Sequence, residues 1–267
     1  MRGRARFFLL LAGLLGILAT QIGAGPVHAE DREIARRRAA ERKTFPDAQI
    51  FDGFFKTAFG AELKFAGRAA RIRKYDGPVR VFVDNRAEPD RSAQVAVVVA
   101  DIKAHIAHLD IAVTQDRSAA TTIIQLLRER DFYPTLRKAY GRKRADQIRK
   151  SLDPQCLSGF AKDAEYRITH SDVYLVADAG DFIFYDCIYE ELLQSMGPIN
   201  DTASVPWTMF NDNVQAGFFD VYDQYILNIL YHPRVRPGMT RAAVRALLPQ
   251  IMPEVRAFIA KVNGLTP

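Results

Sequence analysis

The 267-residue chain has only two cysteines and one tryptophan, and its charges are nearly balanced. It has no CxxC spacing, which disfavours a paired-thiol metal or redox site. Its longest apolar run, residues 7–19, is shorter than the roughly 20 residues that a membrane-spanning helix needs. No internal repeat or low-complexity linker follows this run. With 48% hydrophobic residues, the chain has enough apolar content to fold, which excludes general disorder.

Residues 1–29 are predicted to be a cleavable secretory signal. Arg2, Arg4 and Arg6 precede the apolar run, and the small side chains of Val27 and Ala29 favour cleavage after Ala29. Because no cysteine lies near this junction, nothing is available for lipid attachment. We therefore expect a soluble periplasmic or secreted product that meets the membrane only during export.

The charge that remains after cleavage argues against one class of partner. Removal of the signal takes away three basic residues and no acidic ones, which leaves 34 basic and 31 acidic residues, a net charge of +3. This balance does not favour binding to nucleic acid or to an anionic surface.

Cys156 and Cys187 are the two cysteines. In an oxidising compartment, an even pair favours a disulfide, here closing a loop of about 30 residues and stabilising the fold by roughly 3–4 kcal/mol. A thiol nucleophile or a metal site is the alternative, but no histidine partner is evident.

Apolar periodicity and turn residues predict one α/β (α+β) unit, with helices closing the chain. The sequence divides into a lead-in helix with short strands at 30–74 and a main domain at 75–267. Strands are expected at 50–59, 61–65, 79–83, 111–114 and 121–127, with a strand or hairpin at 164–177. Helices are expected at 30–43, 92–109 with Ser92 as its cap, 133–150, 181–196, 218–230 and 242–262.

The predicted helix at 181–196 separates into an apolar stripe and a polar one. Glu190 and Gln194 are four residues apart and therefore lie on one side, next to Glu191. Gly197 and Pro198 end the helix, so that Asn200 and Asp201 fold back toward its polar side.

This layout resembles the active helix of zincin metallopeptidases, HExxH followed by xxGxxH or xxGxxD. The resemblance spans roughly residues 75–231 and places Glu190 and Gln194 at the two helix histidines. It places Glu191 at the general base, and Asn200 with Asp201 at the third ligand. The segment 207–211 is similar to the methionine-containing turn beneath a metzincin site. The resemblance implies a zincin-like twisted mixed sheet packed on helices.

The metal chemistry departs from that pattern, because both helix histidines are missing. Zinc peptidases need imidazole ligands, whereas Glu190, Gln194 and Asp201 offer only oxygen atoms. No zinc site is expected, and no cofactor is predicted; a hard cation such as Ca²⁺, Mg²⁺ or Mn²⁺ is the only metal that suits this set. His105 and His108 are interpreted as ordinary surface or boundary histidines, and His170 and His232 each stand alone in the sequence.

Two structural interpretations remain beside a functional one. Glu190, Glu191 and Gln194 form either the solvated face of an amphipathic helix or a hydrogen-bond network that packs the Asn200–Asp201 segment against the helix.

The pattern EELxQxxGxxND after Cys187, the segment Phe210–Asn213 and the ending YxPRxxxGM at 231–239 resemble an exported proteobacterial family, domain of unknown function 2927 (DUF2927). The family implies a periplasmic or secreted protein with no established activity. It also implies that the missing histidines are a family trait.

Three hypotheses of function follow. The first is a peptide- or cell-envelope-binding module that uses the groove above the Glu190 helix. The second is an atypical hydrolase with Glu191 as general base. The third is a structural scaffold that contacts envelope proteins through the Pro-bounded segment 231–237, for which an ordinary loop is the favoured interpretation.

Overall fold

The computed structural model describes residues 31–60, 71–152 and 155–266. The predicted signal at 1–29, its cleavage after Ala29 and the predicted strand at 61–65 lie outside these residues. No helix of the described residues combines the length and the apolar character needed to cross a membrane.

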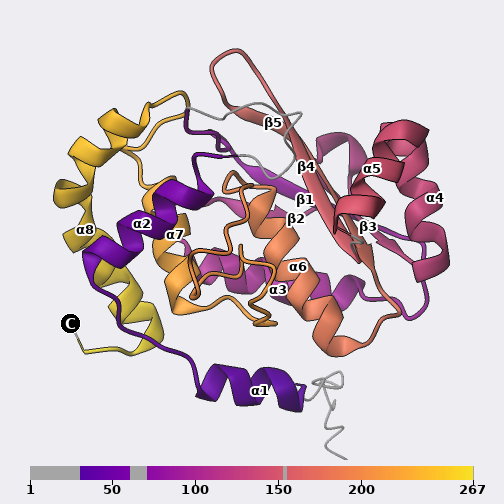
Figure 1. Ribbon diagram of the computed structural model, residues 1–267, viewed down its shortest axis with the longest axis horizontal. Coiled ribbons are helices and arrows are strands. Elements are labelled where there is room, and N and C mark those ends of the chain that lie inside the picture. Colours follow the sequence, from indigo (N-terminus) through magenta and orange to yellow (C-terminus); the bar gives the residue numbers. More distant parts are fainter. Residues whose placement is uncertain (1–30, 61–70, 153–154, 267) are drawn as a thin grey trace, which may run out of the picture. The chain divides into compact units, whose positions relative to one another are not determined.

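Five strands form one mixed sheet in the order β2-β1-β3-β5-β4 (Figure 1). β1, β2, β3 and β5 are parallel, whereas β4 pairs with β5 in the antiparallel sense. The strands are β1 (Val79–Asn85), β2 (Ile111–Val113), β3 (Thr122–Leu127), β4 (Cys156–Lys162) and β5 (Ile168–Val176). The sheet, the helices around it and the helical C-terminal part confirm the predicted α/β class.

Helices cover both faces of the sheet (Figure 1). α3 (Ser92–His105) and α6 (Asp181–Gln194) share the main hydrophobic core with inward residues such as Val173 and Leu175. α4 (Glu129–Tyr140) and α5 (Arg142–Leu152) enclose a second, smaller core around Tyr174 and Val176. Because neighbouring residues of a strand point to opposite faces, the two cores lie on opposite sides of β5.

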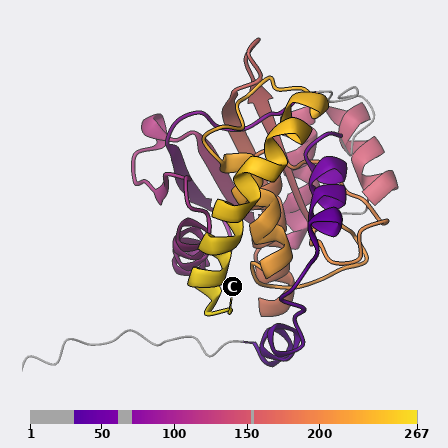
Figure 2. The ribbon, with the colours of Figure 1, turned by 90° about the vertical axis from the view of Figure 1, so that its left-hand side faces the viewer.

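The C-terminal helices complete the main core. α7 (Val221–Tyr231) is buried along its whole length, and α8 (Arg241–Asn263) packs against it and crosses in front of it in Figure 2. Asp220 precedes α7, and its side chain caps the helix by accepting a hydrogen bond from the backbone N–H of Asp223. The predicted helices at 181–196, 218–230 and 242–262 are confirmed with small shifts at their ends.

The predicted strand at 50–59 is wrong, because these residues belong to helix α2 (Asp47–Thr57). Ile50, Phe54 and Thr57 are buried at helical spacing, and the aromatic content that suggested a strand forms the face against α7. Gly53 lies in this contact: a Cβ atom there would meet Tyr222 Oη at 2.1 Å. The lead-in helix at 30–43 is shorter than predicted, α1 (Arg32–Ala39).

Three further boundaries differ from the prediction. The basic stretch 133–150 is two helices that meet at Gly141, whose positive φ of 79° interrupts the helical backbone. Ser92, the predicted cap, is instead the first residue of α3, and Arg91 occupies the cap position. The N–H of Ser92 donates a hydrogen bond to Asp90 Oδ1. The segment 164–177 contributes β5 to a hairpin, whose first strand, β4, was not predicted.

Candidate functional site

α6 is fixed to the edge of the sheet by the disulfide between Cys156 on β4 and Cys187. This bond confirms the predicted pairing. At the C-terminal end of the helix, the hydroxyl of Ser171 on β5 donates to the carbonyl of Ser195 at 2.9 Å. The middle and the C-terminal end of α6 are therefore held against the β4–β5 hairpin, and the side chains between them have fixed neighbours.

Three carboxylates from different segments converge beside α6. Glu190 on the helix, Asp201 just after it and Asp212 in the loop before α7 each offer an oxygen within 4.8 Å of the other two. Glu190 and Asp201 are half-buried and Asp212 is exposed. We call these three residues the carboxylate cluster. Among the described residues, no other group of three or more acidic, histidine or cysteine side chains comes together in this way.

Electrostatics at Glu190 are unfavourable to its charged form. Burial, followed by the charges of Glu191 and Asp201, raises the pKa of the Glu190 carboxyl well above its usual value. A positive group placed at the carboxylate cluster would oppose this shift. The cluster is therefore suited to receiving a cation.

Gln194 and Asp201 are brought together as the sequence suggested. The side-chain amide of Gln194, only 3% exposed, donates to Asp201 Oδ1 at 2.6 Å. This hydrogen bond holds the segment after Gly197 against the end of α6. Gly197 has a φ of 138°, and a Cβ atom there would meet the carbonyl oxygen of Arg73 at 2.3 Å, so that a larger residue would be strained.

Glu191 is not one of the three residues of the carboxylate cluster, and Asn200 bonds elsewhere. The Asn200 amide donates to the Lys56 carbonyl at 2.7 Å and so connects the segment to α2. Glu191 is 7% exposed, and it follows Cys187 by one helical turn on the side of α6 that faces β4. Its position is therefore structural in character, with little access for solvent.

Two acidic residues of this region were not predicted. Asp212 completes the carboxylate cluster, and its only sequence signal was its place in the segment Phe210–Asn213. Asp186 precedes Glu190 by four residues and accepts hydrogen bonds from the backbone N–H groups of Ala216 and Gly217. Burial raises the pKa of Asp186 to about 6. It therefore anchors the same loop that carries Asp212.

The segment 207–211 is held by the first turn of α7. Asp223 accepts hydrogen bonds from Thr208 Oγ1 at 2.5 Å and from the Met209 N–H at 2.7 Å. Asp223 and Met209 are both buried. This contact fixes the part of the loop that comes just before Asp212.

The four histidines considered above have other neighbours. His105 pairs with Asp101, His170 lies 3.5 Å from Asp172, and His232 lies 3.2 Å from Glu254. The His108 ring packs against that of His232. None of them contributes to the carboxylate cluster, whose ligand atoms are oxygens.

Fold and site together define an α/β protein in which a helix, tied by a disulfide to the end strand of a mixed sheet, carries a carboxylate cluster. The chain belongs to the family described as "Protein of unknown function (DUF2927)", whose model matches residues 47–250. The matched region contains all the residues of the candidate site. No curated protein and no solved structure matches the chain.

Proposed function

We propose that this chain is an exported binding protein with a zincin-like scaffold, which takes an extended peptide or peptide-like envelope component beside α6 without conventional zinc catalysis. The observation that carries the proposal is the position of β4, an antiparallel strand at the end of the sheet and next to α6. The Cys156–Cys187 disulfide is compatible with export.

β4 has the backbone geometry for strand addition. Val176 donates to Gln155 at 3.1 Å, and the register pairs Leu157 with Tyr174. Because bonded and non-bonded pairs alternate in antiparallel ladders, the N–H and C=O groups of Ser158 and Phe160 point away from β5. Within the described residues, no strand pairs with this outer side. An extended peptide would form its main-chain hydrogen bonds there.

The carboxylate cluster would give this peptide a preferred side chain. Burial and the neighbouring carboxylates raise the pKa of Glu190, and such a carboxylate is stabilised when an opposite charge enters. A lysine side chain, or a free amino group in an envelope peptide, supplies that charge. We therefore expect a basic residue in the bound peptide to lie over Glu190 and Asp201.

The experiment compares the fluorescence anisotropy of labelled Ala-Ala-Lys-Ala-Ala, acetylated and amidated, with that of a peptide carrying norleucine in place of lysine. The oxidised chain beginning at Glu30 should bind the lysine peptide about tenfold more tightly, and Glu190→Gln should remove that preference. Glu129→Gln, a substitution at an exposed residue of α4, is the control. If the preference for the lysine peptide persists in the Glu190→Gln variant and also in the Asp201→Asn variant, the proposal is contradicted.

Backbone pairing between the peptide and β4 is tested separately, by modifying the peptide. N-methylation of alternate residues removes the donors on one edge of the peptide only. One alternating set should weaken binding at least about tenfold and the other set should not, because only one edge pairs with β4. Equal effects of both sets would exclude strand addition.

Hydrolysis with Glu191 as general base is the alternative function. It is less well supported, because a general base must reach a water molecule and Glu191 is 7% exposed. A peptidase assay of Glu191→Gln beside the unsubstituted chain, together with elemental analysis for a hard cation, tests it. Activity that Glu191→Gln abolishes without unfolding the protein would favour hydrolysis over binding alone.

A further inference from the structure

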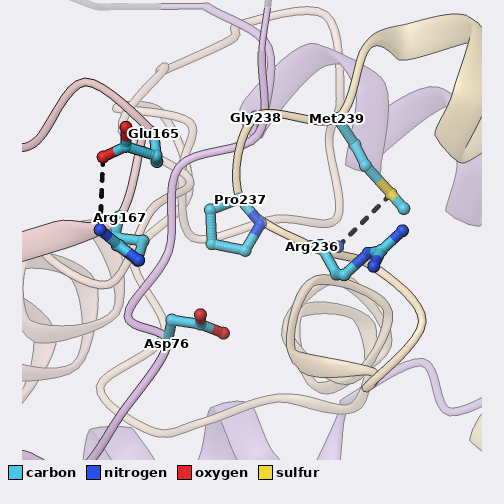
Figure 3. A pocket seen from close by; sticks show the side chains of 7 residues that line it. All are labelled: Asp76, Glu165, Arg167, Arg236, Pro237, Gly238 and Met239. Atoms are coloured by element: carbon cyan, nitrogen blue, oxygen red, sulfur yellow. Dashed lines mark hydrogen bonds and ion pairs between the residues drawn. The ribbon is translucent and has the colours of Figure 1, made fainter.

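A second concave site lies where the segment 236–239 meets the tip of the β4–β5 hairpin (Figure 3). This open pocket has a volume of about 400 Å³ and shares no residue with the carboxylate cluster. Its lining comes from three separate segments: Asp76, Glu165, Arg167, Arg236, Pro237, Gly238 and Met239. It contains the end of the Pro-bounded segment that the proposed function leaves without a role.

The wall formed by 236–239 is held by the backbone of the strand-like segment before β1. Ile72 donates to the Met239 carbonyl, and Gly238 donates to the Ile72 carbonyl, each at 2.9 Å. Gly238 has a φ of 77°, and a Cβ atom there would lie 3.3 Å from the Glu165 carbonyl oxygen. Glycine thus permits the close approach between the two walls.

A buried ammonium group holds the residues just before this segment. Lys74 Nζ donates to the carbonyls of Leu230 at 3.0 Å and Val235 at 2.7 Å, and the side chain lies over the Tyr231 ring. Burial lowers the pKa of Lys74 to about 8, and the charge of Asp76 opposes this shift. The pocket therefore has a preorganised wall and a carboxylate close to a buried cation.

The four charged side chains of the lining differ in how they are engaged. Arg167 donates to Asp163 at 2.6 Å and to Glu165 at 3.3 Å, so this pair is satisfied within the hairpin. Within the part of the chain that the structure describes, neither the Asp76 carboxylate nor the Arg236 guanidinium takes part in a hydrogen bond or ion pair. In Figure 3 the two side chains lie below and beside Pro237, with their charged ends apart.

We propose that this pocket binds a small zwitterion, a free amino acid or dipeptide, with its ammonium group at Asp76 and its carboxylate at Arg236. A guanidinium matches a carboxylate in geometry, and an ammonium group donates charge-assisted hydrogen bonds to a carboxylate. Pro237 and Met239 provide apolar surface for the side chain between the two ends. The proposal concerns a site separate from the strand-addition site at β4.

The experiment titrates the oxidised chain with Ala-Ala, N-acetyl-Ala-Ala and Ala-Ala-amide, with isothermal calorimetry as the measurement. Ala-Ala should bind, and blocking either end should weaken binding at least about tenfold, because each block removes one charge. The Asp76→Asn variant should bind N-acetyl-Ala-Ala and Ala-Ala with equal affinity, because the partner of the ammonium group is gone. The Arg236→Gln variant should bind Ala-Ala-amide and Ala-Ala with equal affinity, because the partner of the carboxylate is gone.

Arg234→Gln is the matched control, because Arg234 lies on the same segment but bonds to Gln250 outside the pocket. It should leave binding unchanged, and so should Glu190→Gln. No binding of Ala-Ala at roughly 10 mM, or blocked dipeptides that bind as well as the free one, would overturn the proposal. Loss of binding in Glu190→Gln would also overturn it, because the dipeptide would then occupy the α6 site. The comparison of blocked ligands on the unsubstituted chain does not depend on how any variant folds.

Discussion

α6 and the α4–α5 pair pack on opposite faces of the same sheet, and both carry many charges, but the charges have different surroundings. Residues 128–150 contain nine basic and three acidic residues. Eight of the nine cations are exposed, and three of the nine stack on Tyr133 or Tyr140. On α6, Glu190 is half-buried with two further carboxylates within 4.8 Å. Charge density alone therefore does not mark the site, whereas burial together with like-charge crowding does.

The comparison also extends to how each helical region is held. The chain has only two cysteines, and their disulfide ties α6 to β4. α4 and α5 depend on apolar packing around Phe132, Leu136 and Ile148. We therefore expect covalent and buried polar contacts to matter most on the α6 side of the sheet.

The largest effect should come from removing the disulfide. The double variant Cys156→Ser/Cys187→Ser should lose about 3–4 kcal/mol of unfolding free energy, because the loop of about 30 residues is no longer closed in the unfolded chain. Urea unfolding followed by circular dichroism measures this loss. Reduction of the unsubstituted chain serves as the control and should give the same urea midpoint as the double variant. If both samples instead keep the midpoint of the oxidised chain, α6 does not depend on the bond.

A second contrast concerns single aspartates near the start of a helix. Asp223→Ala should cost about 2–3 kcal/mol, because it leaves the buried Thr208 hydroxyl and Met209 N–H without their acceptor. Asp131→Ala in α4 removes an ion pair with Arg128 in which both side chains are about two-fifths exposed, and should cost under about 0.5 kcal/mol. Thermal unfolding of both variants provides the measurement. Equal losses of stability in the two variants would contradict the distinction between the two faces of the sheet.

The third and smallest effect depends on pH. The pKa of Glu190 is raised in the folded state, so the native protein binds its proton more tightly than the unfolded chain does. Stability is therefore lost as pH rises from the usual glutamate value toward the raised one. Glu190→Gln should match the unsubstituted chain near pH 4 and be the more stable of the two near pH 8. Glu129→Gln should show no such difference. A Glu190→Gln variant less stable at pH 8 would contradict the assignment.

Much of the fold was accessible from the sequence, because long apolar periodicities survive in the structure. β1, β3 and α6 lie where alternation or helical spacing placed them. α2 was missed because its aromatic residues favour strands locally, whereas their burial against α7 decides the outcome. The break at Gly141 was missed because the basic residues continue across it.

The site was only partly predictable for a related reason. Gln194 and Asp201 are seven residues apart, so helix geometry and the Gly197 turn were enough to bring them together. Asp212 reaches Glu190 through a loop without regular periodicity, and nothing local predicts that contact. Adjacent residues of a helix point about 100° apart, so which of Glu190 and Glu191 faces the cluster depended on how α6 packs on β4.

The central claim is that the carboxylate cluster receives a cationic group from a bound peptide, and a titration of Glu190 tests it most directly. Carboxyl ¹³C NMR of the oxidised chain, with Glu190→Gln for assignment, would follow its pKa with and without the lysine peptide. The account predicts a pKa well above the usual glutamate value in the free protein, and a fall toward that value when the peptide binds. A Glu190 pKa in the ordinary range in the free protein, or one that the bound peptide leaves unchanged, would contradict it.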